Sequence, residues 1–167
     1  GVQTCALPIS SKSLGGSSDG QGSFRFDLVS PGTTQLTVEA DGYLTLVVPV
    51  EVKPRADNVA DLALKKRPKV GLVQVGRTEI TIRQQVQFAV DSAVILPESN
   101  QLLSEVADAI LHNPRIRRIE VQGHTDNTGT ADHNKTLSED RANSVRTWLV
   151  SHGVGPERLT AKGYGQA

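Results

Sequence analysis

The sequence predicts an α+β fold built from two small domains, an antiparallel β domain followed by a mixed-sheet domain with helices. Three observations support this prediction. The chain of 167 residues has room for one ordinary domain or for two small ones. Up to about residue 66, apolar residues alternate with polar ones, as they do in half-buried strands. From Val70 onward, strand patterns alternate with helix patterns, which is typical of a mixed α and β domain.

The first 17 residues are expected to be a leader that is non-native or flexible and lies outside the fold. Gly1 to Ser10 resemble translated sequencing-adaptor sequence, and residues 11–23 are rich in Ser and Gly, which bury too little apolar surface to order a segment. The sequence contains no methionine. We therefore expect the chain to be an internal fragment of a longer protein that has a further region upstream.

Residues 18–66 are predicted to form a small antiparallel β domain. Four segments in this range alternate apolar and polar residues, and turn-forming residues at Pro31-Gly32 and Asp41-Gly42 separate the first three. The apolar positions are Phe24, Phe26 and Leu28, then Leu36, Val38 and Ala40, then Leu44, Leu46, Val48, Val50 and Val52, and finally Leu62 and Leu64. The basic residues that follow predict a solvated linker at residues 67–69.

Three short motifs in this range resemble those of the carboxypeptidase-regulatory-like β-sandwich family. They are Asp19-Gly20-Gln21-Gly22-Ser23-Phe24-Arg25-Phe26, Ser30-Pro31-Gly32 and Ala40-Asp41-Gly42-Tyr43. The resemblance implies a β-sandwich that serves as a spacer or adhesion unit. It carries no information about an activity.

Residues 70–167 are predicted to form a β-α-β-α-β domain. Apolar alternation around Gly76-Arg77 predicts a hairpin, and a strand is expected at residues 86–90. A helix is expected from Pro97 to Asn113-Pro114, because the apolar residues between them fall on one face. A strand leading to Gly123, a second helix from about Ser138 to Gly153 and a strand at residues 159–162 complete the pattern.

Two charged residues of this domain are candidates for holding a ligand. With Glu139 and Asp140 in the expected first turn of the second helix, Arg141 is predicted to lie within about one turn of the helix N-terminus. The helix macrodipole disfavours a cation there by roughly 0.3 to 1 kcal/mol and favours an anion, so Arg141 is expected to attract an anionic group. Asp126, on a loop that ends a strand, supplies the opposite charge. The pair fits a zwitterionic ligand, unless the two side chains simply pair with each other and hold the loop to the helix.

A set of linked motifs resembles the OmpA-like peptidoglycan-binding domain over about residues 69–167. The motifs are Gly123-His124-Thr125-Asp126-Asn127-Thr128-Gly129, Asn134, Leu137-Ser138 with Arg141-Ala142, Val145 with Leu149, Gly153-Val154 and Gly163-Tyr164-Gly165. The resemblance implies that Asp126 holds the ammonium group of the diaminopimelate in the peptidoglycan stem peptide, and that Arg141 holds its carboxylate. Asn134 is implied to assist, and Thr128 is a further candidate contact. A periplasmic location is also implied, with attachment to the outer membrane through the upstream region.

The sequence departs from the family pattern at two places. An Asp often follows the strand phenylalanine in the family, whereas Ala89 follows Phe88 here, and Asp91 is the candidate substitute. The family's last strand would lie beyond Ala167, so the domain is expected to be incomplete, less stable and more prone to aggregate than a complete one.

Composition and motifs argue against other classes of function. The 18 Lys and Arg residues balance 18 Asp and Glu residues, which is not the charge distribution of a nucleic-acid binder. No hydrolase motif occurs and no cofactor is expected, so the chain is predicted not to be an enzyme. Two alternatives are kept: a structural adhesion or spacer module, and a zinc-dependent wall hydrolase with His124, Asp126 and His133 as metal ligands.

Overall fold

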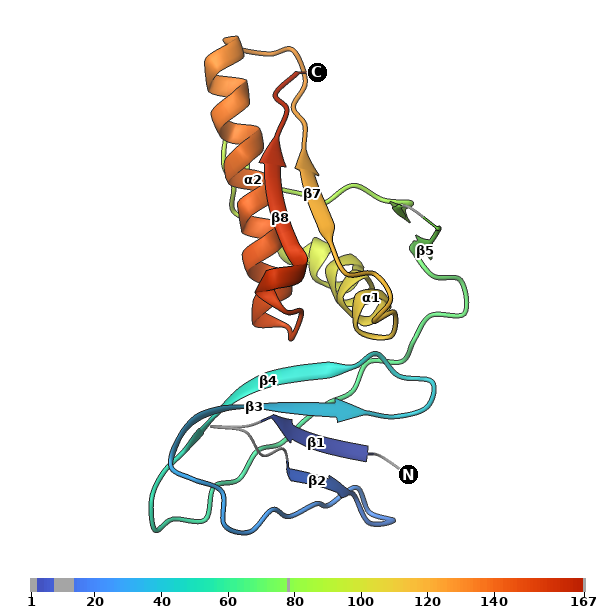
Figure 1. Ribbon diagram of the computed structural model, residues 1–167, viewed down its shortest axis with the longest axis vertical. Helices are drawn as coiled ribbons and strands as arrows, with labels where there is room; N and C mark the ends of the chain where they lie inside the picture. The colour runs from blue at the N-terminus through green and yellow to red at the C-terminus, as the bar shows by residue number, and fades with distance from the viewer. Residues whose placement is uncertain (1–2, 8–13, 78, 167) are drawn as a thin grey trace. The chain divides into compact units, whose positions relative to one another are not determined.

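The computed structural model describes residues 3–7, 14–77 and 79–166. These residues belong to two compact units, Gly1–Lys69 and Val70–Ala167, and each unit is described by itself (Figure 1). Among the helices of the described ranges, none is long and apolar enough to cross a membrane.

The first unit contains a four-stranded antiparallel sheet with the strand order β2-β1-β3-β4. Its strands are β1 (Gln3–Leu7), β2 (Leu14–Ser17), β3 (Gly32–Glu39) and β4 (Leu46–Val52). The pairing of β1 and β2 corrects the expectation of a flexible leader at residues 1–17, of which residues 1, 2 and 8–13 lie outside the described ranges. Strand pairing uses backbone N–H and C=O groups, so an edge of β3 can accept a segment whose composition predicts no structure.

The core of the first unit lies against β3 and β4. Leu36 and Val38 are buried, and apolar side chains from residues 24–26, 46–50 and 62–64 pack against them. The segments at 24–28 and 62–64 were predicted as strands, but neither is a strand in the structure. Their apolar residues cover the sheet without joining it. The described part of this unit therefore has one sheet, and the two-sheet sandwich expected for residues 18–66 is not seen in it.

The second unit joins a β-hairpin to a strand–helix–strand segment. Its elements are β5 (Val73–Val75), β6 (Ile80–Ile82), the short 3-10 helix η1 (Pro97–Ser99), α1 (Asn100–Leu111), β7 (Ile119–Gly123), α2 (Ala131–Ser151), the 3-10 helix η2 (Pro156–Arg158) and β8 (Leu159–Gly163). β5 and β6 form the predicted antiparallel hairpin. β7 and β8 form a parallel pair, with α2 in the connection between them.

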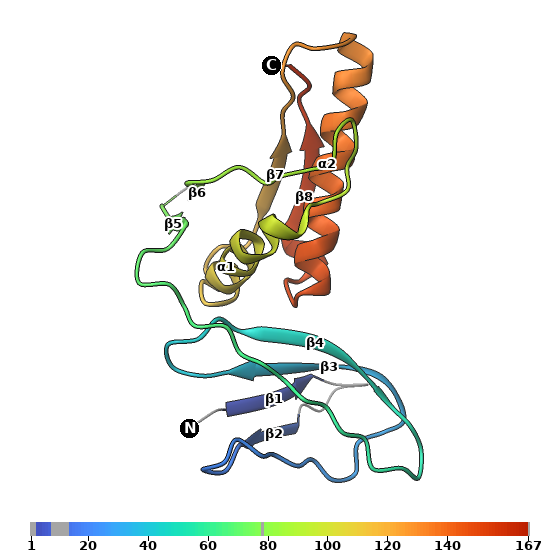
Figure 2. The ribbon, with the colours of Figure 1, turned by 180° about the vertical axis from the view of Figure 1, so that it is seen from behind.

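The strand expected at residues 86–90 is reduced to a single bridge between Phe88 and Ile95. Backbone hydrogen bonds from Ala89 to Val94 and from Leu96 to Gln87, both 2.9 Å, close a short turn-like segment that we call the 88–95 hairpin. Figure 2 shows the chain between β6 and α1 reaching the side of α2 before it returns to α1. This path brings the tip of the 88–95 hairpin to α2.

The side chains between α2 and the β7–β8 pair become smaller toward the C-terminal ends of the strands. The inward-facing pairs are, in order, Ile119 with Leu159, Val121 with Ala161, and Gly123 with Gly163. A Cβ atom on Gly123 would overlap the carbonyl oxygen of Ser138, and one on Gly163 would lie 2.6 Å from Cα of Glu139. Only glycine leaves room for so close a backbone approach, so the glycine pair lets α2 lie directly on the sheet at Ser138.

The other end of this layer is a small apolar core beside a half-buried arginine, Arg158. The core residues are Ala107, Ile110, Leu149, Val154 and Leu159. Beside them, Arg158 donates hydrogen bonds to the carbonyl oxygens of Ile110 (3.1 Å), Asn113 (3.1 Å) and Ile116 (2.7 Å). Carbonyl groups at a helix C-terminus have no partner within the helix, so Arg158 satisfies the end of α1 from η2.

The outer face of the β7–β8 pair carries a polar cluster around Tyr164. The Tyr164 hydroxyl donates to Oε1 of Glu120 (2.9 Å), and the Tyr164 ring stacks on His124 with ring centres 5.3 Å apart. Hydrogen bonds donated by Gln122 and then by Tyr164 lower the pKa of the exposed Glu120 carboxyl. The cluster attaches the segment after β8 to β7.

Candidate functional site

α2 begins at Ala131, seven residues before the start that the sequence predicted near Ser138. Thr130 caps this N-terminus, because its backbone is extended and its Oγ1 accepts a hydrogen bond from the backbone N–H of His133 (3.3 Å). Arg141 therefore lies in the middle of α2, and the prediction that it lies within one turn of the helix N-terminus is wrong. The positive end of the α2 macrodipole lies near Asn134, so the macrodipole does not disfavour a cation at Arg141.

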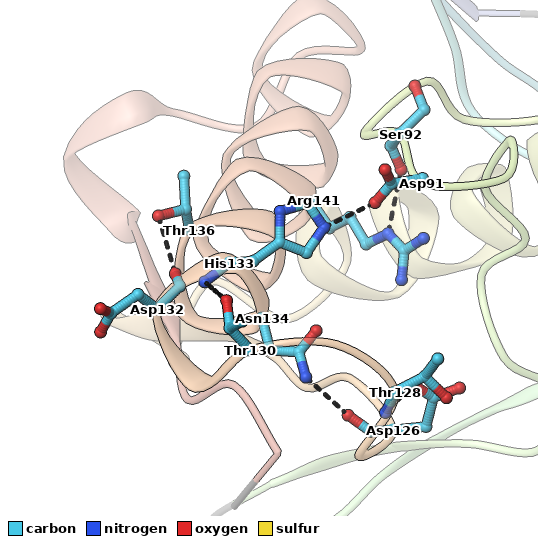
Figure 3. A network of polar contacts seen from close by, with 10 residues as sticks. All are labelled: Asp91, Ser92, Asp126, Thr128, Thr130, Asp132, His133, Asn134, Thr136 and Arg141. Carbon is cyan, nitrogen blue, oxygen red and sulfur yellow. Dashed lines mark hydrogen bonds and ion pairs between the residues drawn. The ribbon is translucent and has the colours of Figure 1, made fainter.

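Asp126 lies exposed on the loop between β7 and α2. Its Oδ1 accepts a hydrogen bond from the backbone N–H of Thr128 (3.0 Å), and its carbonyl oxygen accepts one from the side-chain amide of Asn134 (3.2 Å) (Figure 3). Asn134 is only 2% exposed, so it supports the loop from within α2. Gly129, with a φ of 98°, makes the turn that leads into the helix. These contacts fix the backbone of the loop and leave the Asp126 carboxylate at the surface.

The segment after β8 supports the same loop. The N–H of Thr125 donates to the carbonyl of Gly165, and the N–H of Tyr164 donates to the carbonyl of Gly123, both at 2.8 Å. The N–H of Gly165 in turn donates to Oγ of Ser138 (2.9 Å). α2, the loop after β7 and the segment after β8 therefore form one connected support beneath Asp126.

Arg141 is held by the 88–95 hairpin, which is not part of the support beneath Asp126. Its Nε donates to the carbonyl oxygen of Ser92 (3.0 Å), and its guanidinium carbon lies 5.1 Å from the centre of the Phe88 ring. A hydrogen bond to one edge and an aromatic ring beneath the plane together orient a guanidinium group. Within the described part of the chain, the two Nη nitrogens of Arg141 make no hydrogen bond. The half-buried Arg141 side chain is thus fixed in orientation and keeps both of its terminal N–H₂ groups unused.

Asp126 and Arg141 form no ion pair with each other in the residues that the structure describes. Asn134, which contacts the Asp126 backbone, and Arg141 are seven residues apart on α2, which places them on the same helix face about 10 Å apart along the axis. The alternative in which Asp126 and Arg141 simply hold the loop to the helix as an ion pair is therefore not what the structure shows. The acid and the base lie along one face of α2 with Asn134 between them (Figure 3).

Sequence reasoning missed the contact between His133 and Asp91. Nε2 of His133 lies 2.7 Å from Oδ1 of Asp91, which belongs to the tip of the 88–95 hairpin and has a left-handed backbone with a φ of 48°. The one signal in the sequence is Asp91 itself, the candidate substitute for the Asp that often follows the strand phenylalanine in the family.

The structure also tests the zinc alternative. Across the described ranges no group of three or more His, Cys, Asp or Glu residues is placed to hold a metal, so His124, Asp126 and His133 do not make such a site.

Comparison with known proteins gives relatives for the second unit. The model of the OmpA family matches residues 87–167, the range that contains Asp91, Asp126, Asn134 and Arg141. Outer membrane porin F of Pseudomonas fluorescens is 38% identical over 96 residues, which cover 58% of this chain and 28% of that protein. Outer membrane protein A of Shimwellia blattae is 32% identical over 95 residues, which cover 56% of this chain and 39% of that protein. The chain thus spans less than half the length of these two relatives.

A similar level of identity is found in a solved structure. The peptidoglycan-associated lipoprotein from Burkholderia pseudomallei is 34% identical, and the alignment covers 48% of this chain and 68% of that one with a TM-score of 0.45. The match to the family model and the identity to the two outer membrane proteins lead to one conclusion: residues 87–167 form a domain of the OmpA family.

Proposed function

We propose that the OmpA-family part of this chain binds peptidoglycan non-covalently and anchors an envelope component to the cell wall. Membership of the family supports the proposal, as does the name of the Burkholderia pseudomallei relative, a peptidoglycan-associated lipoprotein. The relatives named as outer membrane proteins support a periplasmic location next to the outer membrane. The proposed activity is binding without a chemical reaction, and residues 18–66 serve as a spacer.

The proposed ligand group is the diaminopimelate of the stem peptide, which carries an ammonium group and a carboxylate on the same carbon. Asp126 receives the ammonium group and Arg141 receives the carboxylate. The observation that carries the assignment is that these two opposite charges lie along one face of α2 without pairing with each other. Asn134 holds the Asp126 loop in place, and the exposed Thr128 is an additional contact at the rim.

The expected affinity of a single site is modest. Hydrogen bonds to charged groups contribute roughly 1.5 to 3 kcal/mol each, and immobilising the ligand opposes this gain. Both groups are at least partly exposed to solvent, which weakens the interaction further. A cell wall presents many identical stems, so rebinding makes attachment to an intact sacculus much stronger than attachment to one stem peptide.

Co-sedimentation with purified diaminopimelate-containing sacculi tests this proposal. The wild-type chain should sediment with the sacculi, and Asp126→Ala or Arg141→Ala should remain in the supernatant. Asn143→Ala is the matched control, because Asn143 is an exposed residue of the same helix away from the site, and it should bind like wild type. Circular dichroism should show that all four proteins are folded.

Competition by soluble stem peptides tests the ligand class. A stem peptide that contains diaminopimelate should release the chain from sacculi. The same peptide with lysine in place of diaminopimelate should do so poorly, because the lysine side chain ends in an ammonium group without a carboxylate. Wild-type sedimentation of both folded site variants would show that the assignment of Asp126 and Arg141 is wrong. Equal competition by the lysine-containing stem peptide would instead show that diaminopimelate is not what the site recognises.

A further inference from the structure

The 88–95 hairpin makes three contacts with α2 over a short stretch of chain. Phe88 lies beneath the Arg141 guanidinium, and the Ser92 carbonyl accepts the hydrogen bond from Nε of Arg141. Asp91, between them in sequence, meets His133 at 2.7 Å. His133 and Arg141 are eight residues apart, or about 12 Å along the helix axis. The hairpin tip is thus attached to α2 at two points, one of which is the arginine itself (Figure 3).

One residue of the tip has a strained backbone. Asp91 has a φ of 48°, a left-handed conformation that is unfavourable for residues other than glycine, although Asp tolerates it better than most. A carboxylate only accepts hydrogen bonds, so Nε2 of His133 carries the proton and donates it to Asp91. This contact holds the left-handed residue directly before Ser92. The peptide that presents its carbonyl oxygen to Arg141 therefore follows a residue fixed by His133.

The contact with Ser92 restricts how Arg141 can receive a carboxylate. A guanidinium group offers two kinds of paired donors, one formed by Nε with one Nη and the other formed by both Nη nitrogens. With Nε bonded to the Ser92 carbonyl, the first pair is occupied and only the second remains. The Phe88 ring limits rotation of the same group. The hairpin thus selects an end-on approach of the ligand.

We propose that His133 is a positioning residue for Arg141: by holding Asp91, it keeps the Ser92 carbonyl on Nε and presents the two Nη nitrogens end-on to the carboxylate of the ligand. This inference rests on the proposed function for the identity of the ligand only. The orientation of Arg141 is a property of the ligand-free chain. His133 and Asp91 are 51% and 66% exposed in their side chains, so their pair contributes little to folding stability and its effect is local.

Nitrogen-15 NMR of the full chain tests the orientation without any ligand. In the wild type, the Arg141 Nε–H signal should exchange slowly with water, because it is bonded to Ser92. His133→Ala and Asp91→Ala should each accelerate this exchange, and the double variant should exchange no faster than either single variant, because the two residues act through one contact. Asn143→Ala, on the same helix but away from the hairpin, should leave the signal unchanged.

Binding of the same variants to sacculi measures the consequence. His133→Ala and Asp91→Ala should each weaken binding about two- to fivefold, the range that exposed ion pairs contribute, without adding together in the double variant. Unchanged Nε–H exchange in His133→Ala would overturn the inference, as would additive effects of the two substitutions. If the wild type binds no sacculi, the proposed function fails, but the exchange measurement still decides whether His133 positions Arg141.

Discussion

Replacing Gly163 by alanine adds one methyl group where α2 lies against the strand. The new Cβ atom would lie 2.5 Å from Oγ of Ser138 and 2.6 Å from Cα of Glu139. Non-bonded carbon atoms are at their optimum at about 3.5 to 4.0 Å, so the helix and the strand must separate by about 1 Å. The obstacle includes helix backbone, which cannot rotate away as the end of a flexible side chain does. The same holds for Gly123→Ala, which meets the carbonyl group of Ser138.

The energetic cost has two contributions. Overpacking of this kind typically destabilises a protein by about 1 to 3 kcal/mol. Separation also weakens the buried hydrogen bond from the Gly165 N–H to Oγ of Ser138, and an unsatisfied buried donor costs about 1 to 3 kcal/mol. We therefore expect a loss of about 2 to 6 kcal/mol. For a unit of this size, such a loss lowers the melting temperature by at least about 10 °C.

Urea unfolding followed by tryptophan fluorescence measures this loss. The chain has one tryptophan, Trp148, which lies in α2 and so reports on the second unit. Gly71→Ala is the matched control, because a Cβ atom there makes only ordinary contacts at 3.6 Å or more. The double variant of Gly123 and Gly163 should lose less than the sum of the single losses, since one displacement of α2 relieves both overlaps. If Gly123→Ala and Gly163→Ala are each as stable as Gly71→Ala, then these two glycines are not required for the close approach of α2 to the strands.

Three further predictions concern other contacts of the second unit. Arg158→Lys should destabilise this unit by about 1 to 3 kcal/mol in urea unfolding, because an ammonium group does not reproduce the set of bonds to the carbonyls at the end of α1; stability equal to wild type would contradict this. Thr130→Ala should cost about 1 kcal/mol through loss of the α2 cap, and Thr130→Ser less. Tyr164→Phe should raise the pKa of Glu120 toward its ordinary value, and Gln122→Ala should raise it more, as followed by NMR titration.

The elements predicted from the sequence are those whose burial is carried by large apolar side chains. β3, β4, α1 and β7 show regular alternation or a wide apolar face, and the structure has them where expected. The first two turns of α2 were missed for the opposite reason. The buried positions of that helix begin with Asn134, Ser138 and Ala142, which are polar or small because the helix lies on glycines. A search for apolar periodicity does not detect a helix whose contact face lacks large side chains.

The candidate residues Asp126 and Arg141 were reached from sequence motifs, while the way in which they are held was not. Asn134 is expected to assist the ligand, and its side-chain amide donates a hydrogen bond to the Asp126 carbonyl oxygen, which no motif indicates. The Ser92 carbonyl that orients Arg141 lies 49 residues away in sequence, and any residue type has a carbonyl group. His133 and Asp91, 42 residues apart, make contact only because the 88–95 hairpin crosses to α2. Contacts that depend on backbone groups and on chain crossing leave little trace in residue identities.

The parallel pairing of β7 and β8 has a consequence during biosynthesis. Leu159, at the start of β8, follows Gly123, at the end of β7, by 36 positions. A ribosome that adds about 5 to 20 residues per second needs about 2 to 7 s to complete that interval. Throughout it, β7 lacks its partner strand, and the carbonyl groups at the end of α1 lack Arg158. The nascent chain is therefore open to chaperones and to misassociation from the completion of β7 onward, and emergence of the η2–β8 segment ends this period.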